Sequence, residues 1–434
     1  MTSVSKSKLG ASPLGREEAR ELFDNRYFLL GFALQKGTPI LILPIVITIV
    51  GTRVYADYVL VFSLVQVAAI LGGVCVAQTL IPFWYSHSEK GQLVSTLSVV
   101  MLALQLLLSI PLGIALWIGL SSGAQVSPTL VPIILIFAVV YNLNAVGLSL
   151  VRVQLKQIAF FWSTLFTAGL LTGFIILLRH VQGPKLLQYT CLNTFVLFIQ
   201  ALFYFSCSGI RLEGVFRSKH LKEFTREILG FSVPLTAYTL IALAAMVADK
   251  WIVRFFFSRA TFAQYVLDFQ FAFGVTLVSV AIGMYNTQKQ CELVYKGAIA
   301  SLRRNVYGNY ILSMAGSLCA AAAGFGYAHF GGIHLSKGYW LLVLGFTLNN
   351  CYGVNSSLLT VQKRSRTIAL ICGVSTLAFL ASLIVCGLRN AIGSVYGAWV
   401  GYEFLLLLLS SASIIAVLRH TEEPRQVLVN AESL

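Results

Sequence analysis

Three charged residues stand within long apolar runs of this sequence: Lys36, Asp268 and Glu403. A charge inside a lipid-spanning helix is costly, and such residues commonly mark substrate or ion pathways. Lys36, with the donor Gln35 beside it, is therefore a candidate binding residue, and the alternative is a lysine that snorkels to the membrane interface. Glu403 is either a structural hydrogen-bonding group or a proton carrier, and the structural role is the favoured one.

Asp268 belongs to a stripe of polar and small residues that recur every three or four positions. The stripe consists of Gln264, Asp268, Ala272, Thr276, Ser279, Gly283 and Asn286. This spacing places all of them on one face of a helix. Such a face lines a cavity or a tight contact between helices, because small residues also allow close packing. Asp268, Thr276 and Ser279 are the candidate cavity residues.

Further charged residues are expected at the ends of membrane spans. Arg53 belongs to the first outer loop, and Asp249, Lys250 and Arg254 to its counterpart in the second half, whereas Arg152 lies at the inner mouth. Each is a candidate for substrate contact, and the competing interpretation is that they set topology and anchor the interface.

The sequence has no pattern that is typical of an enzyme or of a metal protein. It contains no GxxxxGK[ST] loop, no HExxH pair and no CxxC pair. We therefore expect no catalytic residue, no metal and no cofactor, and the eight cysteines are interpreted as small buried apolar residues.

Composition places these residues in a membrane. Hydrophobic residues make up 57% of the 434 residues, and charged residues make up 11%. Soluble domains carry roughly 25% charged residues, so this chain cannot coat a water-facing surface. Apolar runs of about 20 residues, the length that spans a bilayer, predict twelve helices. They lie near 28–50, 58–82, 93–119, 128–150, 158–178, 186–209, 228–249, 262–285, 310–330, 338–360, 367–388 and 393–418.

The positive charges predict the orientation. With both termini in the cytoplasm, 22 Lys and Arg fall in cytoplasmic segments and 8 in outer ones, as the positive-inside rule requires. The net charge of +15 is thus spread over short loops, which excludes nucleic acid as a partner. The expected parts are a cytoplasmic segment 1–27, an N-lobe 28–209, a cytoplasmic linker 210–227, a C-lobe 228–418 and a cytoplasmic tail 419–434.

A short internal repeat supports two halves of six helices each. Tyr55-Ala-Asp-Tyr-Val-Leu-Val-Phe62 enters the second span, and Phe262-Ala-Gln-Tyr-Val-Leu-Asp-Phe269 enters the eighth. Because six is an even number, the two halves have the same orientation and are related by an axis along the membrane normal. The fold class is therefore all-α, polytopic and two-lobed.

The turn between the seventh and eighth spans carries a family resemblance. Pro234 opens the seventh span, Asp249-Lys250 closes it, and Phe262-Ala-Gln-Tyr265 starts the eighth. This pattern resembles the Wzx-type polysaccharide flippases of the MOP exporter superfamily, in which a proline-led helix ends in Asp-Arg or a similar pair before a Gly-x-Tyr-like entry. Lys250 replaces the usual arginine, and the entry here lacks the glycine.

The resemblance implies a flippase that moves a lipid-linked oligosaccharide to the outer leaflet of the bacterial inner membrane by alternating access. It implies the lipid bilayer, a polysaccharide polymerase, a chain-length regulator and a coupling ion (H⁺ or Na⁺) as partners, and a surface polysaccharide such as O-antigen, capsule or exopolysaccharide as the product. The lipid carrier would bring a pyrophosphate to Lys36, and the stripe around Asp268 would line the cavity. The alternatives are a MATE-like cation-coupled antiporter and a membrane-embedded enzyme of polysaccharide biosynthesis.

Overall fold

The computed structural model describes residues 26–86, 90–121, 127–154, 156–209, 218–278, 282, 289–290, 293–294, 298–361 and 364–422. The elements within these residues are all helical, which confirms the all-α class. The first half contains α2 (Arg26–Leu41), α3 (Leu43–Val50), α4 (Thr52–Gly73), α5 (Val76–Ser86), α6 (Lys90–Ser121), the short η1 (Pro128–Leu130), α7 (Val131–Val153), α8 (Gln157–Leu177) and α9 (Lys185–Ser208). The second contains α10 (Ser218–Phe256), α11 (Arg259–Phe273), α13 (Ile299–Phe330), α14 (Gly338–Val361), α15 (Ser365–Leu388) and α16 (Ile392–Glu422).

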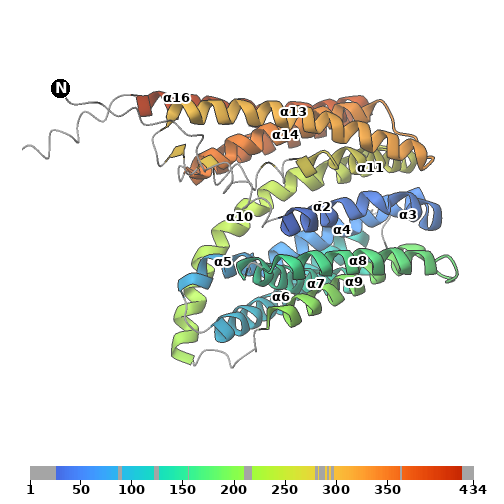
Figure 1. Ribbon diagram of the computed structural model, residues 1–434. Helices are drawn as coiled ribbons and strands as arrows, with labels where there is room; N and C mark the ends of the chain where they lie inside the picture. The colour runs from blue at the N-terminus through green and yellow to red at the C-terminus, as the bar shows by residue number, and fades with distance from the viewer. Residues whose placement is uncertain are drawn as a thin grey trace, which may run out of the picture.

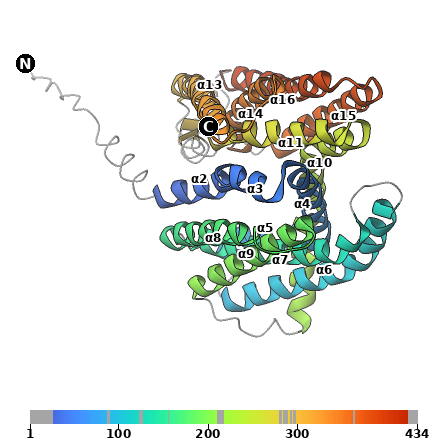
Figure 2. The same cartoon turned by 90° about the vertical axis from the view of Figure 1, so that its right-hand side faces the viewer.

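The helices form two layers, which we call the N-lobe (α2 to α9) and the C-lobe (α10 to α16). In Figure 1, α11 to α16 lie above and the N-lobe lies below, and α10 runs from the upper layer down along the lower one. Both views show α2 and α3 on the side of the N-lobe that faces the C-lobe (Figures 1 and 2). The long α10 joins the layers, because its residue Phe224 packs edge-on against Phe83 of α5, with ring centroids 5.9 Å apart. Ten of the expected residues of the linker, 218–227, are thus part of this helix.

Among the described residues, ten helices are long and apolar enough to cross a membrane. Ten of the twelve expected spans correspond to them. The other two expected spans correspond to α11 and α14, which pack against each other in the C-lobe. The 24 residues of α14 are long enough to span, but they include the buried Asn350 and Asn355. A helix surrounded by protein needs less apolar surface than one that faces lipid, which explains the lower hydropathy of α14.

Two helices of the N-lobe are interrupted within the membrane. Pro39 lies inside α2, and Pro44 lies in the first turn of α3, so the first span is two helices joined at Ile42. Proline lacks an N–H and disturbs the helix that precedes it. The second span breaks between α4 and α5, where Val74 and Cys75 have φ angles of 45° and 50°. The break in the first span agrees with its two prolines, whereas the break at Val74 lies inside the apolar run 58–82, for which one continuous helix was predicted.

Buried amides connect the helices inside the N-lobe. Asn142 of α7 donates to the carbonyl oxygen of Ala69 in α4 at 2.9 Å and to Oε1 of Gln105 in α6 at 2.7 Å. Asn144 on the same helix donates to Oε1 of Gln200 in α9 at 3.1 Å. Satisfied amides of this kind hold apolar helices in one register, because the alternative is an unpaired polar group in an apolar interior.

Candidate functional site

The pair Asp249–Lys250 lies inside a membrane helix. The sequence placed both residues in an outer loop, but α10 continues to Phe256, so that placement was wrong. The Asp249 side chain is fully buried and that of Lys250 nearly so. The helix continues past Asp249 through the largely apolar Trp251–Phe256, and the two opposite charges within it are paired at 3.2 Å.

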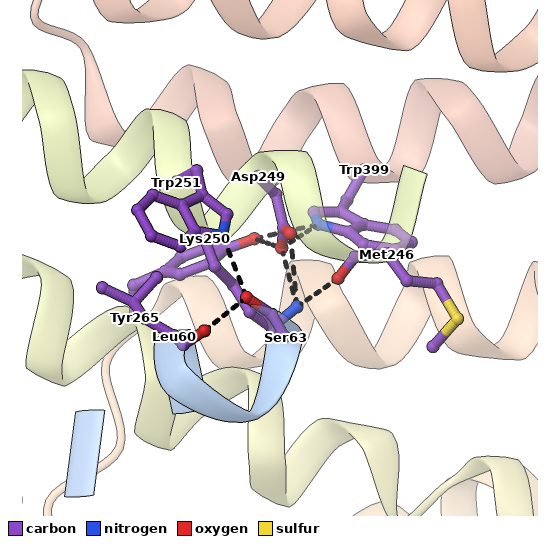
Figure 3. A network of polar contacts seen from close by, with 8 residues as sticks. All are labelled: Leu60, Ser63, Met246, Asp249, Lys250, Trp251, Tyr265 and Trp399. Carbon is purple, nitrogen blue, oxygen red and sulfur yellow. Dashed lines mark hydrogen bonds and ion pairs between the residues drawn. The ribbon is translucent and has the colours of Figure 1, made fainter. Parts of the chain in front are cut away.

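The Asp249–Lys250 pair has a full set of partners, which Figure 3 shows. The Lys250 ammonium donates to Asp249 Oδ1 at 3.2 Å and to the carbonyl oxygen of Met246 at 2.6 Å. The second carboxylate oxygen, Asp249 Oδ2, accepts from the Tyr265 hydroxyl at 2.5 Å and from the Trp399 indole at 3.0 Å. The cluster therefore ties α10 to α11 and α16.

Breaking this pair is expected to destabilise the protein strongly. Asp249→Asn or Lys250→Met leaves one charge buried without its partner, a change that costs about 3–5 kcal/mol. The double variant removes both charges and is expected to recover part of this loss. Thermal unfolding of the purified protein in detergent measures the effect, and Arg53→Gln serves as the control because Arg53 is exposed. Single variants as stable as the control would contradict the assignment.

The same region joins the two lobes. Trp251, next to Lys250, donates from its indole to Ser63 Oγ of α4 at 2.9 Å. Arg259 at the start of α11 forms an ion pair with Asp57 of α4. Asp57 is nearly buried whereas 46% of the Arg259 side chain is exposed, so this ion pair lies at the edge of the contact.

Two further contacts join the lobes between the first span and α13. The Tyr327 hydroxyl of α13 donates to the carbonyl oxygen of Leu41. A Cβ added to Gly331, which follows α13, would lie 3.2 Å from Cβ of Pro44 in α3. These contacts lie where α3 begins and α13 ends, and Figure 1 shows α3 and this end of α13 toward the same end of the molecule. The distribution of Lys and Arg predicts that this end faces the outside.

Asp268 is buried in a second cluster. Its Oδ1 accepts from the Gln264 side chain at 3.0 Å and from the backbone N–H of Ser336 at 2.9 Å. Its Oδ2 accepts from the Ser336 hydroxyl and, at 2.8 Å, from the Tyr396 hydroxyl of α16. Four neutral donors thus hold this carboxylate. Two of them come from Ser336, so the segment between α13 and α14 is held against α11. The structure does not pair Asp268 with Lys36.

The rest of the polar stripe is divided between packing and partial exposure. Ala272 is buried, and Thr276 is half-buried with its hydroxyl bonded to the carbonyl oxygen of Phe273 at 2.7 Å. Ser279 lies outside the described residues. Near Asp268 the stripe is therefore a packed contact between helices, and its role in binding a substrate stays a prediction.

Two cations of the N-lobe, Lys36 and Arg152, are exposed. Lys36 is exposed on α2, and Gln35 beside it is half-buried. Phe32 stands one turn before Lys36 and so on the same face, and the exposed Arg152 of α7 lies over its ring, 5.4 Å from the centroid. Within the described part of the chain, neither Lys36 nor Arg152 forms an ion pair. Arg254 lies elsewhere, over the ring of Phe262 at 6.0 Å.

Glu403 forms a third buried group in the C-lobe. Its side chain is 1% exposed, and both carboxylate oxygens accept from the Asn349 amide of α14 at 2.9 Å. Sequence reasoning missed its relation to Tyr396 and Trp399, which bind Asp268 and Asp249. The signal was present, because these three residues of α16 are spaced three and four apart and lie on one helical face.

Comparisons with known proteins identify the fold. No family model and no curated protein matches the chain. A MATE multidrug transporter of the MOP superfamily in an inward-facing conformation is 11% identical, with a TM-score of 0.68 over 91% of this chain and 99% of the other. An outward-facing one is 12% identical, with a TM-score of 0.62 over 92% and 96%. The lipid II flippase MurJ, in an inward closed conformation, is 16% identical, with a TM-score of 0.55 over 93% and 87%. The two-lobed MOP fold of a multi-pass membrane protein is thereby confirmed.

Proposed function

We propose that the protein is a flippase that moves a polyprenyl-pyrophosphate-linked oligosaccharide from the cytoplasmic to the outer leaflet by alternating access. One observation carries the proposal: Lys36 and Arg152 are exposed cations of the N-lobe, Arg152 lies over the ring of Phe32 one helical turn before Lys36, and neither cation forms an ion pair in the described part of the chain. A pyrophosphate is the group that two such cations suit, since arginine binds phosphate oxygens in pairs and lysine acts as a compact point charge.

The position of Lys36 agrees with this role. It lies on α2, which both views show on the side of the N-lobe that faces the C-lobe (Figures 1 and 2). The polar Gln35 adds a further donor. A lysine that snorkels to the interface would be expected at an end of the span, whereas Lys36 lies six residues inside the apolar segment Leu30–Val50.

The charge of the N-lobe favours an anionic substrate over a cationic one. The expected N-lobe, residues 28–209, contains only two acidic residues, Asp57 and Glu89. Asp57 is paired with Arg259 at the contact between the lobes, and Glu89 lies outside the described residues. A transporter of cationic molecules needs carboxylates in its binding region, so the MATE-like antiporter is the weaker candidate despite the similarity of fold.

Apart from the packing of α10 against α5 at Phe224 and Phe83, the contacts between the lobes support an inward-open state. At the end predicted to be outside, Asp57 pairs with Arg259, and Pro44 approaches Gly331. The higher TM-score with the inward-facing MATE transporter than with the outward-facing one agrees with this assignment. A substrate with a cytoplasmic pyrophosphate would enter in this state, and separation of these contacts would release it outside.

The proposed location is the bacterial inner membrane, with a polysaccharide polymerase and a chain-length regulator acting on the product. Deletion of the gene in the host is expected to remove the surface polysaccharide. The lipid-linked repeat units are then expected to accumulate in the cells, because they are no longer moved to the outer leaflet. Mass spectrometry of extracted lipids and staining of the surface polysaccharide measure both, with the wild-type gene on a plasmid as the control. Normal polysaccharide together with new sensitivity to cationic drugs would instead support the antiporter.

A further inference from the structure

Along one face of α16 lie the three buried carboxylates found among the described residues of the C-lobe. The Tyr396 hydroxyl donates to Asp268 at 2.8 Å, and the Trp399 indole donates to Asp249 at 3.0 Å. Glu403 follows on the same face. At 1.5 Å per residue, the three positions cover about 10 Å along the helix axis, so the carboxylates are staggered through the C-lobe.

The three carboxylates differ in how their charge is balanced. Asp249 has the ammonium of Lys250 at 3.2 Å. Asp268 has four donor groups, two of them from Ser336. Glu403 has one amide, that of Asn349, and no cation among the described residues. Because a buried anion without a counter-charge is costly, Glu403 is the carboxylate for which binding a proton gains the most.

The elements around Glu403 bring no opposite charge to it. The whole of α14 contains no Asp, Glu, Lys, Arg or His, and α15 contains only Arg366 in its first turn. The titratable side chains that these two helices bring are weak acids, for instance Cys372, which bonds to Tyr352 at 3.1 Å. The charged groups nearest along the face of α16 are Asp249 and Lys250, which neutralise each other one turn away at Trp399.

The partner of Glu403 suits both protonation states. As observed, the Asn349 N–H groups donate to both carboxylate oxygens, which is the arrangement for the ionised acid. When the Asn349 amide group rotates by half a turn, its oxygen faces Glu403 instead and accepts a hydrogen bond from the O–H of the neutral acid. An apolar partner would serve the neutral form only, and an arginine the charged form only.

We infer that Glu403 takes up and releases one proton in each transport cycle, and that the proposed flippase is coupled to protons at this site. The identity of the transported lipid rests on the proposed function, whereas the assignment of the proton to Glu403 rests on the contacts of this side chain alone. Water supplies the proton when the C-lobe opens around α16, and water receives it when the acid ionises. Repacking of α14 against α16 then follows the charge on Glu403, because the neutral acid is buried at a lower cost than the anion.

The test combines a transport measurement with a spectroscopic one. In proteoliposomes with a fluorescent lipid-linked oligosaccharide, an imposed pH difference is expected to shift the distribution of the lipid between leaflets by up to about tenfold per pH unit, the value for one coupled proton. Glu403→Gln keeps the size and the hydrogen bond to Asn349, and it is expected to abolish the shift. Glu227→Gln, the same change at an exposed position of α10, is the matched control.

Infrared difference spectra of the purified protein between acidic and alkaline pH report the proton without any cargo. The wild-type protein and Glu227→Gln are expected to show a carboxylic-acid C=O band that Glu403→Gln lacks. A Glu403→Gln protein that keeps the band or the pH-driven shift would overturn the inference. If Glu403→Gln lacks the band but the wild-type protein does not transport the lipid, the proposed function is overturned and the proton site at Glu403 is still supported.

Discussion

Lys36→Ala is expected to lower transport of the lipid-linked oligosaccharide at least about a hundredfold, while the protein inserts at its normal level. A cation that contacts a pyrophosphate away from bulk water is worth several kcal/mol, by analogy with buried ion pairs. A loss of about 2.7 kcal/mol already lowers affinity about a hundredfold. Insertion is unaffected because Lys36 is exposed and makes no hydrogen bond or ion pair with the described residues.

Two further variants separate charge from shape at this position. Lys36→Arg keeps the charge and is expected to retain part of the transport, whereas Lys36→Gln keeps a polar side chain and is expected to lose it. Complementation of the surface polysaccharide in a deletion strain measures transport, and an immunoblot measures the amount of protein. Arg179→Ala, which removes an exposed cation beyond α8, is the matched control. Wild-type export from a well-expressed Lys36→Ala protein would leave this lysine with a topological role only.

Hydropathy was sufficient to predict the all-α class and ten of the twelve expected spans, in their order along the chain. The expected spans near 338–360 and 367–388 match α14 and α15 within two residues at each end. The two-lobed organisation was also visible, because the repeated Ala-x-Tyr-Val-Leu-x-Phe pattern lies on α4 and α11, and these two helices contact each other across the lobes. The repeat predicted two related halves, and the structure adds that the two helices carrying it are helices at which the halves meet.

The positions of single charges were harder to predict. Asp249 and Lys250 were expected in a loop because a hydropathy window cannot register that adjacent opposite charges cancel. The partners of Asp268 could not be predicted from the sequence either, since Ser336 and Tyr396 lie 68 and 128 positions away along the chain. The stripe showed which face of α11 is polar, but the element that covers this face is decided by tertiary packing.

Lys36 illustrates the opposite case. Its chemistry was evident from a charge within an apolar run, and the structure adds Arg152 at the neighbouring Phe32. The contact between Arg152 and Phe32 depends on tertiary packing, which the sequence pattern does not specify. The candidate residues were therefore accessible from sequence, and the contact that brings Arg152 of α7 to α2 was not.

A reversible cross-link tests whether the two lobes must separate at the predicted outer end to move the lipid. Pro44→Cys and Gly331→Cys place two sulfur atoms on opposite lobes, and a Cβ at residue 331 lies 3.2 Å from that of Pro44. This is close to the roughly 3.5–4.5 Å that a disulfide needs. The pair is introduced into an active background without the eight native cysteines, and the single variants serve as controls.

The measurement follows a fluorescent polyprenyl-pyrophosphate oligosaccharide in proteoliposomes, with an impermeant quencher reporting the leaflet that it occupies. We predict that the reduced double variant translocates the lipid, that oxidation stops translocation in proportion to the cross-linked fraction, and that a reductant restores it. The single variants should be indifferent to both treatments. Translocation by the fully cross-linked protein at the rate of the reduced protein would contradict alternating access between these lobes.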